Sequence, residues 1–202
     1  MIGTFLDKIF RRTFTLMKLN FMFIMISMMG GILLGVGPAF LSITDLYIRH
    51  GFKHEEMHFT SLFPMFKDNF KRGNTLFYTY GLSIFFVVYN LYLSFQFTNP
   101  FVVLIQIIMV FVIGFLLVSY LYCVVINSYY QIKLLDLIKL GTLSFFANLI
   151  KIVRLIISMA AIYFIYKIMP GLLIFGIFSL LIIVSVESLR SWVKIIEETI
   201  TY

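Results

Sequence analysis

Residues 73–132 form the longest stretch without a charged side chain: GNTLFYTYGLSIFFVVYNLYLSFQFTNPFVVLIQIIMVFVIGFLLVSYLYCVVINSYYQI. A transmembrane helix needs about 20 apolar residues, so this stretch is too long for one span and long enough for two. The tripeptide Thr98-Asn99-Pro100 interrupts its apolar character, and an Asn-Pro pair favours a turn. The pattern therefore predicts transmembrane helices at 75–97 and 101–126, joined by a tight turn.

The composition of the whole chain excludes a soluble domain. Of the 202 residues, 61% are hydrophobic and only 12% are charged, and the mean hydropathy is +1.02. Ordinary soluble domains are about 45–50% apolar and about 25% charged. Too few polar side chains remain to cover the surface of a soluble core of this size. We therefore expect an all-α, multi-spanning transmembrane helical bundle, with residues 1–202 forming a single membrane domain.

Further apolar segments flank the central pair. Segments 150–169 and 171–188 are predicted spans, separated by the turn-forming pair Pro170-Gly171. The last of these helices is expected to continue as a polar tail over 189–202. With the apolar segment 19–44, the chain has about five predicted spans.

The basic residues indicate how the chain is oriented. The net charge is +7, from 16 Lys and Arg against 9 Asp and Glu. Because these residues lie between apolar segments, we interpret them as orientation signals and as contacts to anionic lipid, and expect no nucleic-acid partner. The elbow at 45–74, with its amphipathic helices, and the second elbow before 150–169 are Lys- and Arg-rich. The positive-inside rule therefore places both elbows and the C-terminus in the cytoplasm, with the protein in the cell membrane.

The N-terminal region allows two interpretations. Residues 1–18 are basic and amphipathic, which is typical of a helix lying in the membrane interface. If segment 19–44 crosses once, this basic helix lies outside, against the positive-inside rule. If the chain breaks at Gly35, Gly37 and Pro38 and returns as a hairpin, the N-terminus is cytoplasmic, which the rule favours. Such a break is a tight structural corner or, as in transporters, a point where backbone groups meet a solute.

An aromatic and basic stretch, Phe63-Pro-Met-Phe-Lys-Asp-Asn-Phe-Lys-Arg72, precedes the second span. Its three Phe residues are spaced to share one helical face, and its two Lys residues share another. This pattern favours an interfacial helix whose bases meet lipid headgroups, or a helix that docks on a partner subunit. The candidate docking residues are Phe63, Phe66, Lys67, Asn69, Phe70, Lys71 and Arg72.

Two stretches resemble a known family. The corner Gly35-Val-Gly-Pro-Ala39 and the stretch from Phe63 to Arg72 are similar to motifs of the YesL-like family of bacterial integral membrane proteins. Proteins of that family have about this length and no assigned biochemical activity. Their genes often lie beside those for oligosaccharide uptake through ABC importers and for glycan breakdown. The resemblance therefore implies an accessory role in carbohydrate import. The Trp that family members often carry in the first span is absent, since the one Trp here is Trp192.

The sequence His54-Glu-Glu-Met-His58 matches the H-E-x-x-H signature of zinc hydrolases. On a helix, two His residues four positions apart can share a metal ion while the intervening Glu acts as a base. Gly51 disfavours a helix there, and no third ligand stands out downstream. We therefore interpret this segment as a solvated loop, expect no metal or other cofactor, and keep a zinc hydrolase only as a remote alternative.

Several catalytic signatures are missing. The sequence has no P-loop, no G-x-S-x-G nucleophile motif, and no E-A-A coupling signature of an importer permease at 133–154. We therefore expect a non-enzymatic accessory protein of the membrane. Its expected partners are the lipid bilayer and ABC importer permease subunits, with a second copy of the chain as another candidate. The alternative hypothesis is an independent small-solute carrier or channel.

Overall fold

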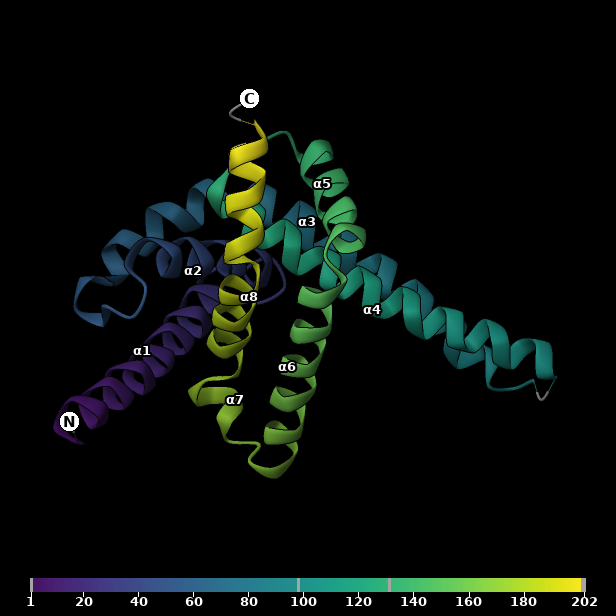
Figure 1. Cartoon of the computed structure of the whole chain (residues 1–202), viewed down its shortest axis with the longest axis horizontal. Helices are drawn as coiled ribbons and strands as arrows, with labels where there is room; N and C mark the ends of the chain where they lie inside the picture. Colours follow the sequence, from purple (N-terminus) through teal and green to yellow (C-terminus); the bar gives the residue numbers. More distant parts are fainter. Residues whose placement is uncertain (1, 98, 131, 201–202) are drawn as a thin grey trace.

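The computed structural model describes residues 2–97, 99–130 and 132–200, and every regular element in these ranges is helical. The expected all-α class is thus confirmed. Met1, Thr98, Gln131, Thr201 and Tyr202 lie outside the described residues. The helices are α1 (Ile2–Met29), α2 (Val36–His50), α3 (Phe59–Ser94), α4 (Pro100–Tyr129), α5 (Leu134–Ala147), α6 (Leu149–Ile168), α7 (Leu172–Phe175) and α8 (Ile177–Ile200), with a 3-10 turn, η1, at His54–Glu56 (Figure 1).

Among the described residues, two helices are long and apolar enough to cross a membrane, namely α3 and α4. Helices α5 and α6, which are bent by 96° at their junction, count as a third span if the pair is taken together. The structure therefore supports a membrane protein with two to three candidate spans and does not confirm the prediction of about five. In Figure 1, α3 and α4 project together from one side of the molecule, whereas α6 and α8 run in a different direction.

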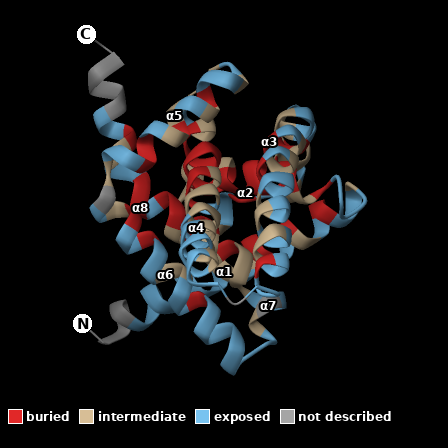
Figure 2. Ribbon diagram, turned by 90° about the vertical axis from the view of Figure 1, so that its right-hand side faces the viewer, coloured by how far each residue is buried: buried red, intermediate tan, exposed pale blue. Residues whose placement is uncertain are grey.

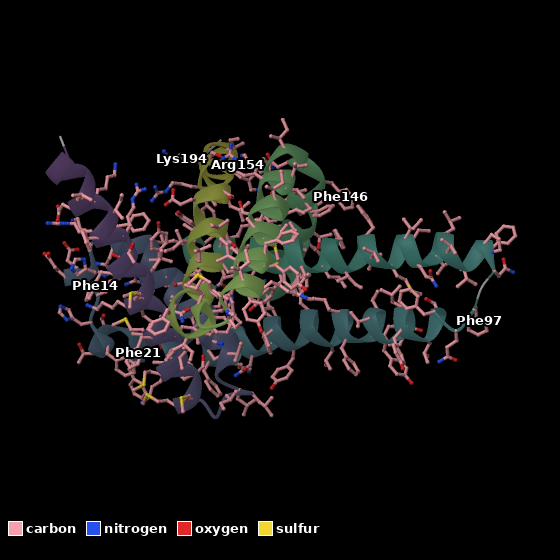
Figure 3. The ribbon with its side chains drawn as sticks, turned by 90° about the horizontal axis from the view of Figure 1, so that it is seen from below. Phe14, Phe21, Phe97, Phe146, Arg154 and Lys194 are labelled. Atoms are coloured by element: carbon pink, nitrogen blue, oxygen red, sulfur yellow. The ribbon has the colours of Figure 1, made fainter. Side chains whose placement is uncertain are left out.

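The hairpin of α3 and α4 agrees closely with the charge-free stretch of the sequence. Its turn lies where expected, immediately before α4. The Asn99 side chain accepts a hydrogen bond from the Phe101 amide at 3.0 Å, and Pro100 occupies the first turn of α4. Both residues are favoured at a helix start. Phe97 lies at the far end of the hairpin, away from Phe14 and Phe21 of α1 (Figure 3).

The outer part of the hairpin exposes large apolar side chains along its length, among them Leu82, Phe85, Tyr92, Phe101 and Ile107. An apolar surface of this extent on a soluble protein would mark an interaction site or cause aggregation. On a charge-free hairpin of membrane-spanning length, it indicates a surface that faces lipid.

Helix α2 lies at the centre of the molecule. Its residues from Gly37 to Thr44, together with Leu46 and Tyr47, are buried, and the buried residues gather around it in Figure 2. It packs against α1, α3, α4 and α8. A helix buried on all faces is held by protein rather than by lipid, so α2 acts as the core onto which the other helices pack.

The expected helix break at Gly35, Gly37 and Pro38 requires a correction. Helix α1 continues without interruption from the basic segment 1–18 to Met29, and the chain turns at residues 30–35, with Gly35 at the end of this turn. Gly37 and Pro38 lie inside the first turn of α2. Proline is tolerated there because a helix leaves its first amides unpaired anyway, so the missing N–H costs no hydrogen bond.

Gly37 and Pro38 instead allow a close approach between α2 and α3. A Cβ atom on Gly37 would lie 2.5 Å from the Gly73 carbonyl oxygen, and one on Gly73 would lie 2.5 Å from Pro38 Cα. Further along, Asn69 of α3 contacts Asp45 of α2. The two helices therefore run antiparallel, with their backbones in direct contact at one end and polar side chains at the other.

The predicted span 171–188 is broken at Gly176, between α7 and α8, and helix α8 continues into the tail as expected. The buried Asn20 of α1 binds both sides of the break. Its Nδ2 donates to the Ile174 carbonyl at 2.6 Å, and its Oδ1 accepts from the amides of Phe178 at 3.0 Å and Ser179 at 3.2 Å. Asn20 thus supplies the partners that the start of α8 would otherwise lack.

Replacing Asn20 by leucine is expected to lower the free energy of unfolding by about 1–3 kcal/mol, because it leaves buried backbone groups unpaired. Thermal unfolding of the purified protein in mild detergent measures this effect. Asn90→Leu is the matched control, since the side chain of Asn90, within the described ranges, binds the Phe86 carbonyl of its own helix alone. An equal loss of stability in both variants would contradict the role given to Asn20.

Candidate functional site: a polar cleft at the base of the hairpin

A cleft of about 390 Å³ opens between α2, α3 and the C-terminal end of α4. This volume lies within the range of about 300–1,000 Å³ that is typical of small-ligand sites. Three segments that are distant in sequence meet here, and most of the side chains that they contribute are polar or charged. The lining residues are Asp45, Arg49, Met65, Asp68, Asn69, Arg72, Asn127, Ser128, Tyr129 and Tyr130.

The charged lining comes from one spacing that occurs on two neighbouring helices. Asp45 and Arg49 are four residues apart on α2, and Asp68 and Arg72 are four residues apart on α3. A separation of four residues places both members on the same helical face. Among the described residues, none of these four side chains forms a salt bridge with another. Two positive and two negative groups therefore line the cleft without a salt bridge between them among the described residues, although Arg49 acts on Asp45 electrostatically.

The order of these charges follows from the antiparallel packing of α2 and α3. Arg72 precedes Gly73, which contacts the start of α2, whereas Arg49 lies near the exposed end of α2. Asp45 and Asp68 lie between the two arginines along the cleft. Arg72 is thus the charge nearest to the apolar hairpin, and Arg49 is the farthest from it.

Asp45 is the most buried of the acidic groups in the cleft. Its Oδ2 atom accepts a hydrogen bond from Asn69 Nδ2 at 2.8 Å. Burial raises the pKa of Asp45 above its ordinary value, while the side chains of Ser128, Asn69 and Arg49 act in the opposite direction. The surrounding polar groups thus favour the carboxylate that burial disfavours, which suits a group that accepts hydrogen bonds from a charged ligand.

Arg72 connects the cleft to the second elbow. Its Nη2 atom donates to the carbonyl oxygen of Ile132, in the connection between α4 and α5. Its Nε atom is buried and has no hydrogen-bond partner among the described residues. A buried guanidinium donor without a partner is costly, and ligands commonly satisfy such groups.

The predicted docking residues lie in three different environments. Phe66 is only 5% exposed, and its ring lies under the turn between α1 and α2, 2.8 Å from where a Cβ atom on Gly30 would be. Phe66 is therefore a core residue of this chain. Lys67 and Lys71 are exposed, and Lys67 Nζ lies 5.0 Å from the centre of the half-buried Phe63 ring. Phe70 remains partly exposed beside Phe66, while Asn69 and Arg72 line the cleft.

The H-E-x-x-H segment does not form the helical face that a zinc site of this type requires. His54 lies in η1, and His58 is extended at the start of α3. Glu56 instead binds His50 Nδ1 and Lys53 Nζ, each at 3.2 Å, and these two contacts lower its pKa. In the part of the chain that the structure describes, no group of three His, Cys, Asp or Glu side chains is placed to hold a metal ion.

A second cleft, of about 560 Å³, lies between α1, α2 and α8. Its charged groups are already engaged within the protein. Tyr47 donates to Glu187 at 3.0 Å, Arg190 lies 3.6 Å from the same carboxylate, and the Arg12 guanidinium lies 5.1 Å from the centre of the Phe52 ring. The cleft between α2, α3 and α4 is therefore the stronger candidate for a binding site.

Sequence reasoning identified only part of this site. It singled out Asn69 and Arg72 within the aromatic and basic stretch, but it did not single out Asp45, Arg49 or Asp68. It also missed the lining contributed by the last turn of α4 and by Tyr130, which follows it. The repeated Asp-x-x-x-Arg spacing is the signal that could have pointed to the charged groups, although the spacing alone does not show that the two helices pack together.

Comparison with known proteins finds a family model that matches part of the chain. A family described as "Protein of unknown function, DUF624" matches residues 16–91. The matched segment contains the second half of α1, all of α2 and most of α3, and thus two of the three helices that line the cleft. No curated protein and no solved structure matches the chain.

Proposed function

We propose that this chain is a non-enzymatic integral protein of the cell membrane that acts as an accessory component of oligosaccharide uptake, together with an ABC importer. The observation that carries the proposal is the continuity of α3. One helix of 36 residues runs from the elbow, at Phe59, into the apolar hairpin, to Ser94. Side chains on its first turns are thus fixed rigidly to the part that faces lipid, which suits a surface that positions a membrane partner.

The proposed topology follows the distribution of basic residues. The chain has about five spans, and α1 and α2 form a hairpin that keeps the basic N-terminal segment on the same side as the two elbows. The elbows and both termini are cytoplasmic, as the positive-inside rule favours. Helices α5 and α6 form the second elbow and its return span.

The docking surface consists of Lys67 and Lys71 on α3, with the half-buried Phe63 beneath Lys67. These lysines do not line the polar cleft, so they are free to meet acidic groups of an importer permease. The importer as the partner rests on the resemblance to YesL-like proteins, with which the family match over residues 16–91 is consistent.

The double substitution Lys67→Glu with Lys71→Glu is expected to reduce co-purification of the importer permease at least about tenfold, because like charges replace complementary ones at the interface. The measurement is mass spectrometry of proteins that co-elute from the native membrane in mild detergent. Lys139→Glu, an exposed change on α5, is the control and should leave the partner bound. Purification of the wild-type chain without any partner, with solute flux in liposomes that contain it alone, would contradict the proposal and support an independent carrier.

A further inference from the structure

With the hairpin of α3 and α4 placed across a bilayer, the polar cleft lies at the depth of the lipid headgroups. Arg72 is the last charged residue before the charge-free stretch 73–132, and the α4 side of the cleft, residues 127–130, lies at the other end of that stretch. The cleft therefore opens where the apolar hairpin ends on the elbow side. In a bilayer this is the boundary between hydrocarbon and headgroups, where polar and aromatic side chains gather.

The charges in the cleft favour a ligand that carries both signs. Two arginines and two aspartates line it, and no salt bridge joins them among the described residues. A simple anion would be attracted by the arginines but repelled by Asp45 and Asp68, and a simple cation would meet the opposite problem. A zwitterion can be complementary to both pairs while remaining neutral overall.

The order of the charges matches one headgroup in one orientation. In a phosphoethanolamine headgroup the phosphate lies next to the glycerol, and the ammonium lies farther from the hydrocarbon. Arg72 is nearest to the hairpin, and its buried Nε is a donor without a protein partner, so it is placed to bind the phosphate, which guanidinium groups bind well. Asp68, one helical turn farther out, and Asp45 beside it are placed to accept hydrogen bonds from the ammonium.

The acidic pair also distinguishes between two common zwitterionic lipids. A primary ammonium has three N–H donors that carboxylates can accept, whereas the quaternary ammonium of phosphocholine has none. Asp45 is already positioned by the hydrogen bond from Asn69, so its geometry is fixed before a ligand arrives. Such preorganisation favours a headgroup that donates hydrogen bonds.

We propose that the cleft between α2, α3 and α4 is a binding site for the headgroup of a phospholipid with a phosphate and a primary ammonium, of which phosphatidylethanolamine is the simplest. Arg72 binds the phosphate, and Asp45 and Asp68 bind the ammonium. The proposal requires the hairpin to lie in a bilayer, but it does not depend on an importer partner.

The test uses the full-length chain, delipidated in mild detergent and then supplied with phosphatidylethanolamine, phosphatidylglycerol or phosphatidylcholine. Retention of each lipid is measured by native mass spectrometry, and stabilisation by the shift in Tm, since a ligand that binds the folded state raises stability. We expect phosphatidylethanolamine to be retained at least about tenfold better than the other two, as is typical when hydrogen bonds to charged groups are gained.

Asp68→Asn and Arg72→Gln are each expected to reduce this preference about tenfold. Asp68 is exposed and so tests the site without disturbing the core, whereas Arg72 also contacts Ile132. Lys139→Gln, which removes an exposed charge outside the cleft, should retain the preference.

Equal retention of phosphatidylcholine or phosphatidylglycerol, or an unchanged preference in Asp68→Asn, would overturn the proposal. Equal stabilisation by free O-phosphoethanolamine would show that the cleft binds a soluble zwitterion and not the headgroup of a lipid. Loss of importer co-purification would leave these results unaffected.

Discussion

Gly73→Ala is expected to destabilise the folded protein by about 1–3 kcal/mol, even though alanine is the better helix former. A Cβ atom at this position would lie 2.5 Å from Pro38 Cα and 2.6 Å from Pro38 N. These are backbone atoms of the central helix and cannot move aside as a flexible side chain could. The helices must separate, which would also displace Asn69 from Asp45. The melting temperature in detergent measures the loss.

Gly81→Ala on the same helix is the matched control. A Cβ atom on Gly81 would meet nothing within 4 Å, so this substitution should leave the melting temperature unchanged or raise it, because alanine stabilises an open helical position. Equal melting temperatures for the Gly73 and Gly81 variants would show that the contact between α2 and α3 is not as close as described.

Ile108→Arg is expected to prevent stable insertion of the hairpin. Ile108 is 53% exposed on the outer part of α4, within the charge-free stretch. At the centre of a transmembrane helix, arginine costs about 2.5–3.5 kcal/mol. On the surface of a soluble protein the same change would be nearly neutral. The amount of full-length protein in the membrane fraction, relative to wild type, measures this effect and should fall several-fold.

Leu135→Arg provides the control for that experiment. Leu135 is 72% exposed at the start of α5, in the elbow beside Lys133 and Asp136, where an arginine can contact headgroups. Its level in the membrane fraction should equal that of wild type. If both arginine variants accumulate normally, α4 does not face hydrocarbon.

The hairpin was the most predictable part of the fold, because its signal lies in a single continuous segment. The absence of charge from 73 to 132 and the turn-forming pair Asn99-Pro100 together define α3, α4 and their connection. Where α3 begins was less predictable. The span was expected from residue 75, but the helix starts at Phe59 and includes Pro64, because nothing between the elbow and the span requires the helix to end.

The first break was expected at Gly35, Gly37 and Pro38, but only Gly35 lies in the turn, for a reason that one sequence cannot reveal. Gly37 and Pro38 are typical of a chain break, yet they lie in the first turn of α2, where proline costs no hydrogen bond. The advantage of small residues there is the contact with Gly73, on another helix. The role of Gly37 and Pro38 depends on how α2 packs against α3, which the sequence alone does not show.

The aromatic stripe shows the same limit. The spacing of Phe63, Phe66 and Phe70 correctly indicates a helical face, since all three lie on α3. Spacing does not show what covers that face. The turn between α1 and α2 buries Phe66, while Phe70 remains partly exposed. The cleft was equally hidden, because its charges come from two helices and its remaining lining comes from a third.

In the proposed topology, α3 and α4 form a membrane-crossing hairpin with the cleft and the elbow on its cytoplasmic side. The most direct test is labelling of Asn99→Cys and Lys67→Cys with a membrane-impermeant maleimide in intact cells. The native Cys123 is fully buried and so gives little background. We expect the cysteine at position 99 to be labelled in intact cells, and the one at position 67 to be labelled only after permeabilisation. Labelling of both positions from the same side of the membrane would contradict this topology.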